Sequence, residues 1–150
     1  MSLGPSHPVW TKLYTALASL ASECGGTFAF VLDEGNGLWC VGLPHQAPTT
    51  FTAHENRAAD RFYRDVIVPK MTSLRRGVHL DVAKVDGDDR HAALSFAGIY
   101  VVVVWFDAPF DPSLVRARLR RALPEVEKLT LALPPYDGPG TDEGAARARA

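Results

Sequence analysis

The chain has 150 residues, of which 47% are hydrophobic and 22% are charged, and its formal net charge is −1. This length suits one domain with its own hydrophobic core, and the nearly balanced charge argues against a main role in nucleic-acid binding, which usually requires a basic excess. The two cysteines are too few for a disulfide framework, and no apolar run reaches the roughly 18 residues that span a bilayer, so no membrane insertion is expected.

The first half of the sequence predicts a helix, a hairpin and a second helix. Apolar residues at spacings of three and four predict a helix that begins near Pro8 and ends at a Gly-Gly pair. The apolar runs TFAFVL and LWCVGL flank the segment DEGNG, so residues 27–43 are expected to form a hairpin. The segment TAHE matches a capping box that starts a helix at Ala53. Pro69 is expected to kink this helix or to end it at the preceding residue.

The second half predicts three strands. In the segment GVHLDVAKV, Val78, Leu80 and Val82 alternate with more polar residues, which is the period of a half-buried strand over residues 78–85. The segments RHAALSFA and IYVVVVWF predict two further strands. The continuous apolar run of the second segment predicts a central strand that is covered on both faces.

The last predicted element is a helix. Asp111 is a typical N-cap, and Pro112 suits the first helical position. An apolar stripe at spacings of three and four then continues to Leu133. Because Pro124 interrupts this stripe, we expect either a kink near residues 120–122 or two shorter helices.

The predicted elements belong to a single domain of residues 8–133. Their order is helix, strand, strand, helix, strand, strand, strand, helix. Residues 1–7 are expected to form a flexible N-terminus. Residues 134–150 contain too few apolar side chains to pack, so they are expected to form a disordered tail.

The sequence contains no complete catalytic or cofactor-binding motif. The segment HENRA begins like the zinc-protease motif H-E-x-x-H, but Ala58 occupies the position of the second histidine. There is neither a P-loop for nucleotide phosphates nor a G-x-S-x-G nucleophile elbow. Cys24 and Cys40 are expected to be buried packing residues, because neither has a local sequence that would activate a thiolate, although a distant histidine could approach one of them. We therefore expect a protein that is not an enzyme and that has no cofactor and no resident metal.

Two charged segments allow both a structural and a functional interpretation. Asp86, Asp88 and Asp89 in VDGDDR could hold a hard cation, but the spacing of a calcium loop is missing and a solvated hairpin turn is favoured. The arginines of the last helix could form a docking patch for anionic groups, although such residues more often form the exposed side of an amphipathic helix. These arginines are Arg116, Arg118, Arg120 and Arg121.

The chain resembles the Roadblock/LC7 family, most closely in the segment VVVVWFDAPFDPSLVRARLRRAL. In the bacterial MglB-like branch of that family, a hydrophobic final strand ends in a Phe-Asp pair, here Phe106-Asp107, and a short turn leads to a helix that begins Leu-Val-Arg, here residues 114–116. The resemblance covers residues 8–133 and implies an α+β fold of order α-β-β-α-β-β-β-α. In that fold a five-stranded antiparallel sheet lies between two helices on one face and one on the other. It also implies a homodimer in which middle strands join into one extended sheet.

The resemblance implies a function in protein binding, because Roadblock proteins are dimeric platforms for other proteins. The short tail of mixed charge favours the MglC-type adaptors of the branch, and hence a non-enzymatic adaptor in a bacterial cell-polarity and motility system of the MglA/MglB type. The implied partners are another MglB-like Roadblock protein, a polarity response regulator, or both, and the implied location is the cytoplasm, including the cell poles. The alternative is a direct GTPase-activating or exchange partner of a Ras-like MglA GTPase.

Two surfaces are candidates for these contacts. If the strand over residues 78–85 lies at an edge of the sheet, its unpaired N–H and C=O groups invite pairing with a second copy. The side chains expected at this dimer interface are Val78, Leu80 and Val82. Pairing would also bring the two middle helices together as one platform, where we expect a partner to dock on Arg57, Arg61, Phe62 and Arg64.

Overall fold

The computed structural model describes residues 8–133, 139–140 and 143–144. The expected flexible N-terminus over residues 1–7 lies outside the described residues, and so does most of the expected tail over residues 134–150. Within that tail the structure describes two strands of two residues each, β6 (Pro139–Gly140) and β7 (Glu143–Gly144), which pair with each other.

The predicted strands assemble into one antiparallel sheet of five strands in the order β2-β1-β5-β4-β3. The first two strands form the expected hairpin, and β5 lies between β1 and β4 at the centre. The strand bounds are β1 Phe28–Asp33, β2 Leu38–Gly42, β3 Asp81–Lys84, β4 Arg90–Phe96 and β5 Tyr100–Phe106.

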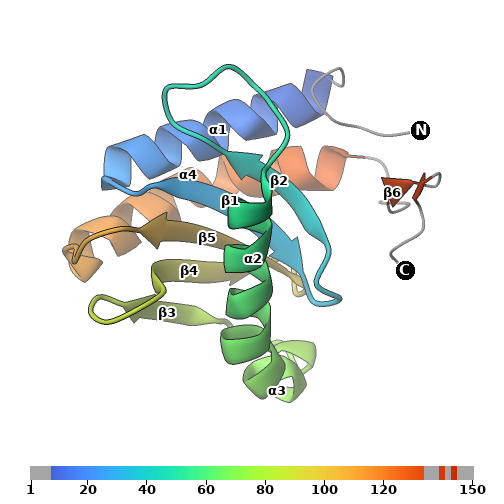
Figure 1. Cartoon of the computed structure of the whole chain (residues 1–150). Helices are drawn as coiled ribbons and strands as arrows, with labels where there is room; N and C mark the ends of the chain where they lie inside the picture. The colour runs from blue at the N-terminus through green and yellow to red at the C-terminus, as the bar shows by residue number, and fades with distance from the viewer. Residues whose placement is uncertain (1–7, 134–138, 141–142, 145–150) are drawn as a thin grey trace.

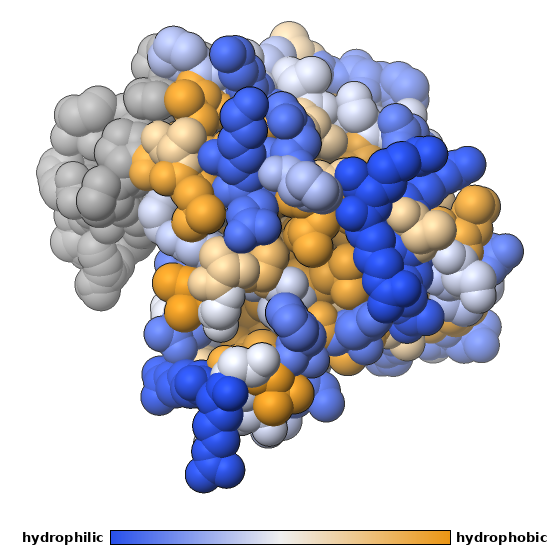
Figure 2. Space-filling view, turned by 180° about the vertical axis from the view of Figure 1, so that it is seen from behind, coloured by the Kyte–Doolittle hydropathy of each residue, from blue (hydrophilic) through white to orange (hydrophobic). Residues whose placement is uncertain are grey.

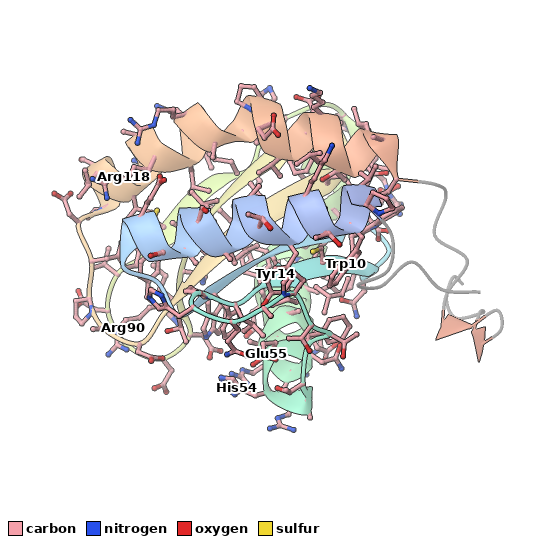
Figure 3. All side chains as sticks on the ribbon, turned by 90° about the horizontal axis from the view of Figure 1, so that it is seen from above. Trp10, Tyr14, His54, Glu55, Arg90 and Arg118 are labelled. Carbon is pink, nitrogen blue, oxygen red and sulfur yellow. The ribbon has the colours of Figure 1, made fainter. Side chains whose placement is uncertain are left out.

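Helices cover both faces of this sheet. Helix α2 (Ala53–Phe62) crosses the front face in Figure 1, and α1 (Pro8–Cys24) and α4 (Pro112–Ala132) lie together behind it. The view from above shows the same three layers, with the sheet between α2 and the α1–α4 pair (Figure 3). Helix α1 lies close to the sheet because Gly42 has no side chain: a Cβ at this position would meet the backbone of α1 at Leu17 and Ala18.

The core forms on both faces of β5, as its continuous apolar run predicts. Residues 101–104 are almost fully buried. On the α2 face, Trp105 stacks on Phe28, and Phe30 meets Phe62 of α2 edge to face. A strand buried on both faces fixes the layers relative to each other, so the exposed edges of the sheet are held in a defined place.

Helix α2 begins as the sequence predicts. The capping box forms, since the Glu55 carboxylate accepts a hydrogen bond from the Thr52 backbone N–H at 2.6 Å and the Thr52 hydroxyl accepts from the His54 N–H at 3.2 Å.

The helical conformation does not end at the residue before Pro69. A π-helical turn (Tyr63–Ile67), a 3₁₀ turn (Val68–Lys70) and a short helix α3 (Met71–Arg75) follow α2 directly. The N–H of Val68 bonds to the carbonyl of Tyr63 in the wider π pattern. The change of helical pitch lets the backbone continue through a residue that has no N–H to donate.

Helix α4 is one helix of 21 residues with Pro124 inside it, so the expectation of two shorter helices is wrong. Its N-cap forms as predicted, because the Asp111 carboxylate accepts from the N–H groups of Ser113 and Leu114. The predicted apolar stripe packs inward through Val115, Leu119, Val126, Leu129 and Leu133. Packing of this stripe on both sides of Pro124 outweighs the local cost of the proline.

Candidate functional site

Strand β3 lies at the edge of the sheet, as the dimer hypothesis requires. The carbonyl of Leu80 accepts a hydrogen bond from the N–H of Ser95 at 2.9 Å, so Leu80 bonds inward to β4. In an antiparallel ladder every second residue turns its backbone groups to the same side. The N–H and C=O groups of Asp81 and Ala83 therefore point away from β4, along an edge that no other described strand covers.

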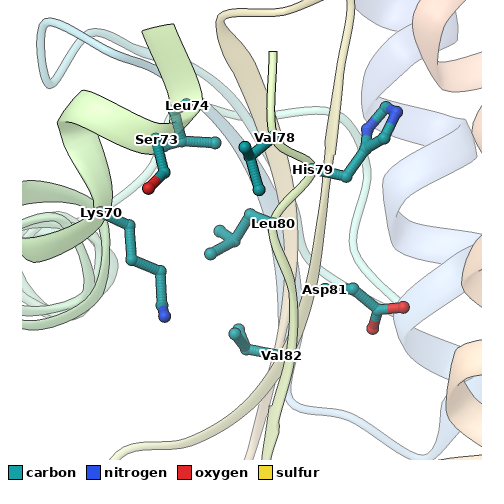
Figure 4. A pocket seen from close by; sticks show the side chains of 8 residues that line it. All are labelled: Lys70, Ser73, Leu74, Val78, His79, Leu80, Asp81 and Val82. Carbon is teal, nitrogen blue, oxygen red and sulfur yellow. The ribbon is translucent and has the colours of Figure 1, made fainter. Parts of the chain in front are cut away.

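A groove lies beside this edge, between β3 and the turn that carries α3. It encloses about 160 Å³ and is lined by Lys70, Ser73, Leu74, Val78, His79, Leu80, Asp81 and Val82. Figure 4 shows Val78, Leu80 and Val82 on the side of the strand that faces Lys70 and Leu74, with His79 and Asp81 on the opposite side. The predicted alternation of this segment is therefore confirmed, and it gives the edge strand an apolar flank.

The regular part of the strand is shorter than the predicted residues 78–85, since β3 covers Asp81–Lys84. Leu80 is 3% exposed and belongs to the core. Its side chain therefore offers little surface to a second copy. Val78 is 57% exposed, and Val82 is partly buried.

Asp81 links the edge strand to α4. One carboxylate oxygen accepts from Arg116 Nε at 2.8 Å, and the other accepts from an Arg120 guanidinium nitrogen at 2.8 Å. Arg116 and Arg120 are four residues apart and so share one face of the helix, but the sequence gives no sign of the carboxylate that they share. Two of the arginines proposed as an anionic docking patch thus hold β3 against α4.

The other two arginines of α4 also have partners within the chain. Arg118 donates to the backbone carbonyl of Glu23, and Arg121 lies 3.9 Å from the Glu23 carboxylate. The structural interpretation of the basic helix is the better one, since all four guanidinium groups serve contacts between elements.

The residues expected to bind a partner have different surroundings. Phe62 is 2% exposed and packs in the core, so its side chain offers little surface to a partner. Arg61 is held by two parallel hydrogen bonds to Asp89, from Nε and from a terminal nitrogen, each of 3.0 Å. Arg64 forms an exposed ion pair with Asp60. Arg57 is exposed, so Arg57 and Arg64 are the two members of the set that a partner could reach freely.

The acidic turn after β3 is a structural turn. Asp89 fastens it to α2 through Arg61, and this bond raises the pKa of the Arg61 guanidinium. No group of three or more potential metal ligands occurs among the described residues. Asp86 and Asp88 are exposed, and neither forms a hydrogen bond or a salt bridge within the described part of the chain.

His91 is a titratable residue of the core that the sequence analysis did not single out. Its ring lies 5.0 Å from that of Phe62 and stacks on Trp105 at 6.0 Å. The Nδ1–H group donates to the carbonyl oxygen of Asp89 at 2.8 Å, which fixes the neutral tautomer. Burial lowers the pKa of His91 below its ordinary value, so the residue supports the packing of α2 on the sheet in its neutral form.

The two thiols show no sign of activation. Cys40 is buried and Cys24 is partly buried, and both are free. Burial raises the pKa of Cys24 to about 11 and also raises the pKa of Cys40. A thiol whose pKa is raised is a poor nucleophile at neutral pH. Cys40 is a packing residue as predicted, and Cys24 lies at the rim of the core.

On the face of the sheet opposite α2, helices α1 and α4 form the surface. Figure 2 shows the face of the molecule that carries α1 and α4, where hydrophilic side chains alternate with hydrophobic patches. Leu114 and Leu131 of α4 are exposed, which is ordinary for single apolar residues on a surface. No helix among the described residues is long and apolar enough to span a membrane. The edge of β3 with its groove is therefore the candidate site for interaction.

The comparisons with known proteins agree with this architecture. No protein-family model and no curated protein matches the sequence. Myxococcus xanthus MglB has a TM-score of 0.60 at 19% identity, covering 83% of this chain and 98% of its own. A gliding protein, MglB from Thermus thermophilus, has a TM-score of 0.62 at 14% identity, covering 88% of this chain and 98% of its own. MglC from Myxococcus xanthus has a TM-score of 0.54 at 14% identity, covering 76% of this chain and 95% of its own.

Identities of this size show a shared fold and leave the function to be argued from the surface of this chain. The five-stranded antiparallel sheet and the division of helices between its two faces are those that the family resemblance implied. The chain therefore has the MglB-like Roadblock/LC7 fold.

Proposed function

We propose that this chain is a non-enzymatic, homodimeric adaptor in a bacterial cell-polarity and motility system of the MglA/MglB type. The observation that carries the proposal is the free edge of β3, where Asp81 and Ala83 present backbone donors and acceptors beside an apolar groove. Unpaired strand edges are sites at which another chain adds by main-chain hydrogen bonds. The shared fold with MglB and MglC supports the choice of biological system.

A second copy of the chain is the proposed occupant of this edge. Antiparallel addition of its own β3 would continue the sheet and cover part of Val78 and Val82. The two α2 helices would then lie on the same face of one extended sheet. Arg57 and Arg64, which are exposed, would form part of the surface that meets an MglB-like Roadblock protein, a polarity response regulator, or both.

The chemistry of the described residues favours binding over catalysis. His91 is enclosed by aromatic rings and does not line the groove beside β3. The thiols have raised pKa values. Ser73, His79 and Asp81 all line the groove, but His79 and Asp81 lie on the side of the strand away from Lys70 and Leu74, and Asp81 is bound to Arg116 and Arg120. We therefore propose that any GTP hydrolysis belongs to a partner protein, and that the chain acts in the cytoplasm and at the cell poles.

Binding and GTP turnover, measured together, test the adaptor role. We expect the purified chain to bind an MglB-like protein or a polarity response regulator in a pulldown, and to leave the GTP turnover of an MglA-like GTPase unchanged. Substitution Arg57→Glu should weaken this binding, because it reverses an exposed charge on the proposed platform. Lys12→Glu is the matched control, since Lys12 is an exposed residue of α1 on the opposite face.

The same assay separates the two functions. Stimulation of GTP turnover or of nucleotide exchange by this chain alone would contradict the adaptor role and support a direct regulator of the GTPase. Binding to none of these proteins would contradict both.

A further inference from the structure

The groove beside β3 has one polar wall and one apolar wall. Lys70, Ser73 and Leu74 stand at spacings of three and four along the helical segment that ends in α3, so they share the side that faces the strand. The opposite wall is the apolar flank of β3, where Val78 is 57% exposed and Val82 is partly buried. The groove therefore sets the polar groups of one element against exposed apolar surface of another (Figure 4).

Two hydrogen-bond donors on the polar wall have no partner among the described residues. Neither the ammonium group of Lys70 nor the hydroxyl group of Ser73 forms a hydrogen bond or an ion pair within that part of the chain. The carboxylate of Asp81 also lines the groove, but it lies on the opposite side of the strand and is bound to Arg116 and Arg120. The two donors are therefore available to a group from another molecule.

The charged residues around the groove leave it cationic. Lys70 is part of its lining, and Lys84 lies on the same face of β3 as Val82, because side chains two positions apart in a strand share a face. Asp86 and Asp88, in the turn after β3, come beyond Lys84 in the chain and are not among the residues that line the groove. A negatively charged group is therefore the electrostatic complement of this site.

The volume of the groove suits the side chains of a protein segment better than a small molecule. It encloses about 160 Å³, whereas pockets for small molecules usually enclose about 300 to 1,000 Å³. Pockets at protein interfaces take single anchor side chains, which contribute much of the binding energy. A carboxylate can accept from both an ammonium and a hydroxyl group, and charge-assisted hydrogen bonds of this kind are stronger than neutral ones.

We propose that the groove anchors an acidic side chain of a partner protein, whose carboxylate binds Lys70 and Ser73. In an extended segment, apolar side chains two positions before and after the acidic residue share its face, and their spacing matches that of Val78 and Val82. The inference rests on the proposed function and adds the chemistry of the segment that the partner presents. It uses side chains that point out of the plane of the sheet, whereas a second copy at the edge would bond to the free backbone groups of the strand, which lie along that plane.

Binding of a short peptide to the full chain tests the inference. The probe is the peptide Leu-Ala-Glu-Ala-Val, acetylated and amidated so that it carries no terminal charges, and the control is the same peptide with Gln in place of Glu. We expect the Glu peptide to shift the backbone N–H resonances of Ser73, Val78 and Val82 in NMR spectra. The Gln peptide should bind about tenfold more weakly, because it loses the charge-assisted hydrogen bonds.

Matched variants locate the carboxylate site. Lys70→Gln removes the charge of an exposed side chain and should abolish the preference for the Glu peptide, whereas Lys70→Arg keeps the charge and should keep the preference. Ser73→Ala, which removes the second donor, should weaken binding of the Glu peptide severalfold. Lys128→Gln makes the same change of charge at an exposed position of α4 and should leave the binding of both peptides unchanged.

The outcomes distinguish this inference from the proposed function. Equal binding of the two peptides, binding of neither, or an unchanged preference in Lys70→Gln would overturn the anchor site and leave the adaptor role, which the pulldown tests, standing. Weaker self-association of Lys70→Gln in sedimentation would show that a second copy occupies the groove, and would also overturn the anchor site. Selective binding of the Glu peptide by a chain that captures no protein in the pulldown would support the anchor site and contradict the adaptor role.

Discussion

His91 connects the acidic turn to the packing of α2. Its ring lies between Phe62 of α2 and Trp105 of β5, and its Nδ1–H group is bound to the carbonyl of Asp89. The side-chain charges that act on it are those of Lys84 and Asp89. A proton added to Nε2 would place a positive charge among these rings, and burial of that charge is what lowers the pKa.

The lowered pKa makes stability depend on pH in a defined window. The unfolded chain binds a proton at His91 near pH 6.5, whereas the folded chain binds it only at lower pH. The contribution of neutral His91 is therefore complete above pH 6.5 and decreases as the pH falls from 6.5 toward the folded-state pKa. The loss is about 1.4 kcal/mol for each unit of pH between the two pKa values.

Urea unfolding of the wild type and of His91→Gln on both sides of pH 6.5 measures this dependence. We expect the wild type to lose more stability at the acidic pH than the variant does. His79→Gln is the control, because His79 is exposed and should keep the full wild-type dependence. Parallel pH profiles for the wild type and His91→Gln would contradict the assignment.

Val78 and Leu80 share one face of the edge strand but differ in exposure, and the sequence did not show this difference. The alternation of Val78, Leu80 and Val82 predicted their common face, and this was confirmed. Leu80 is nevertheless buried because Leu74 and the α3 turn cover it, and α3 was not predicted. Burial on an edge strand depends on which element lies above it, and here that element follows Pro69, where the helix was expected to kink or to end.

At the scale of elements, local signals predicted most helix and strand boundaries well. The capping box, the Asp-Pro helix start and the buried run of β5 all act through contacts within a few residues or through strong hydrophobicity. Pro124 is different, since its local cost opposes a helix that tertiary packing then maintains. The position of the candidate site at β3 required the strand order, which periodicity alone does not contain.

Removal of this proline should stabilise the protein. Pro124 is exposed, so Pro124→Ala loses little packing, and it restores an N–H that can bond to the carbonyl of Arg120. We expect the free energy of unfolding to rise by up to about 3 kcal/mol, measured by urea denaturation. Pro112→Ala is the control and should give no such gain, because the first helical position needs no intrahelical donor. An unchanged or lower stability for Pro124→Ala would show that α4 has adapted to the proline elsewhere along its length.

At the scale of the whole molecule, the rigid three-layer core presents β3 as an edge to which another strand can be added. The opposite edge, β2, has Gly42 packed under α1 and continues into the loop that leads to α2. Strand addition at β3 requires little rearrangement, since the groups of Asp81 and Ala83 already point outward from a sheet fixed by β5. Folding and association should then be thermodynamically linked, because a second copy binds the folded chain alone.

A proline at Ala83 tests this linkage while leaving the monomer intact. Ala83 is exposed, and its N–H points away from β4, so Ala83→Pro removes a donor of the free edge and no hydrogen bond within the sheet. Extended backbone at the preceding Val82 is also compatible with a following proline. The melting temperature of the wild type should rise with protein concentration, whereas that of Ala83→Pro should stay constant at the value of the dilute wild type. Ala83→Val, which keeps the N–H, should behave like the wild type. A dimeric Ala83→Pro variant in sedimentation, with a melting temperature that still rises with concentration, would place the interface elsewhere than on β3.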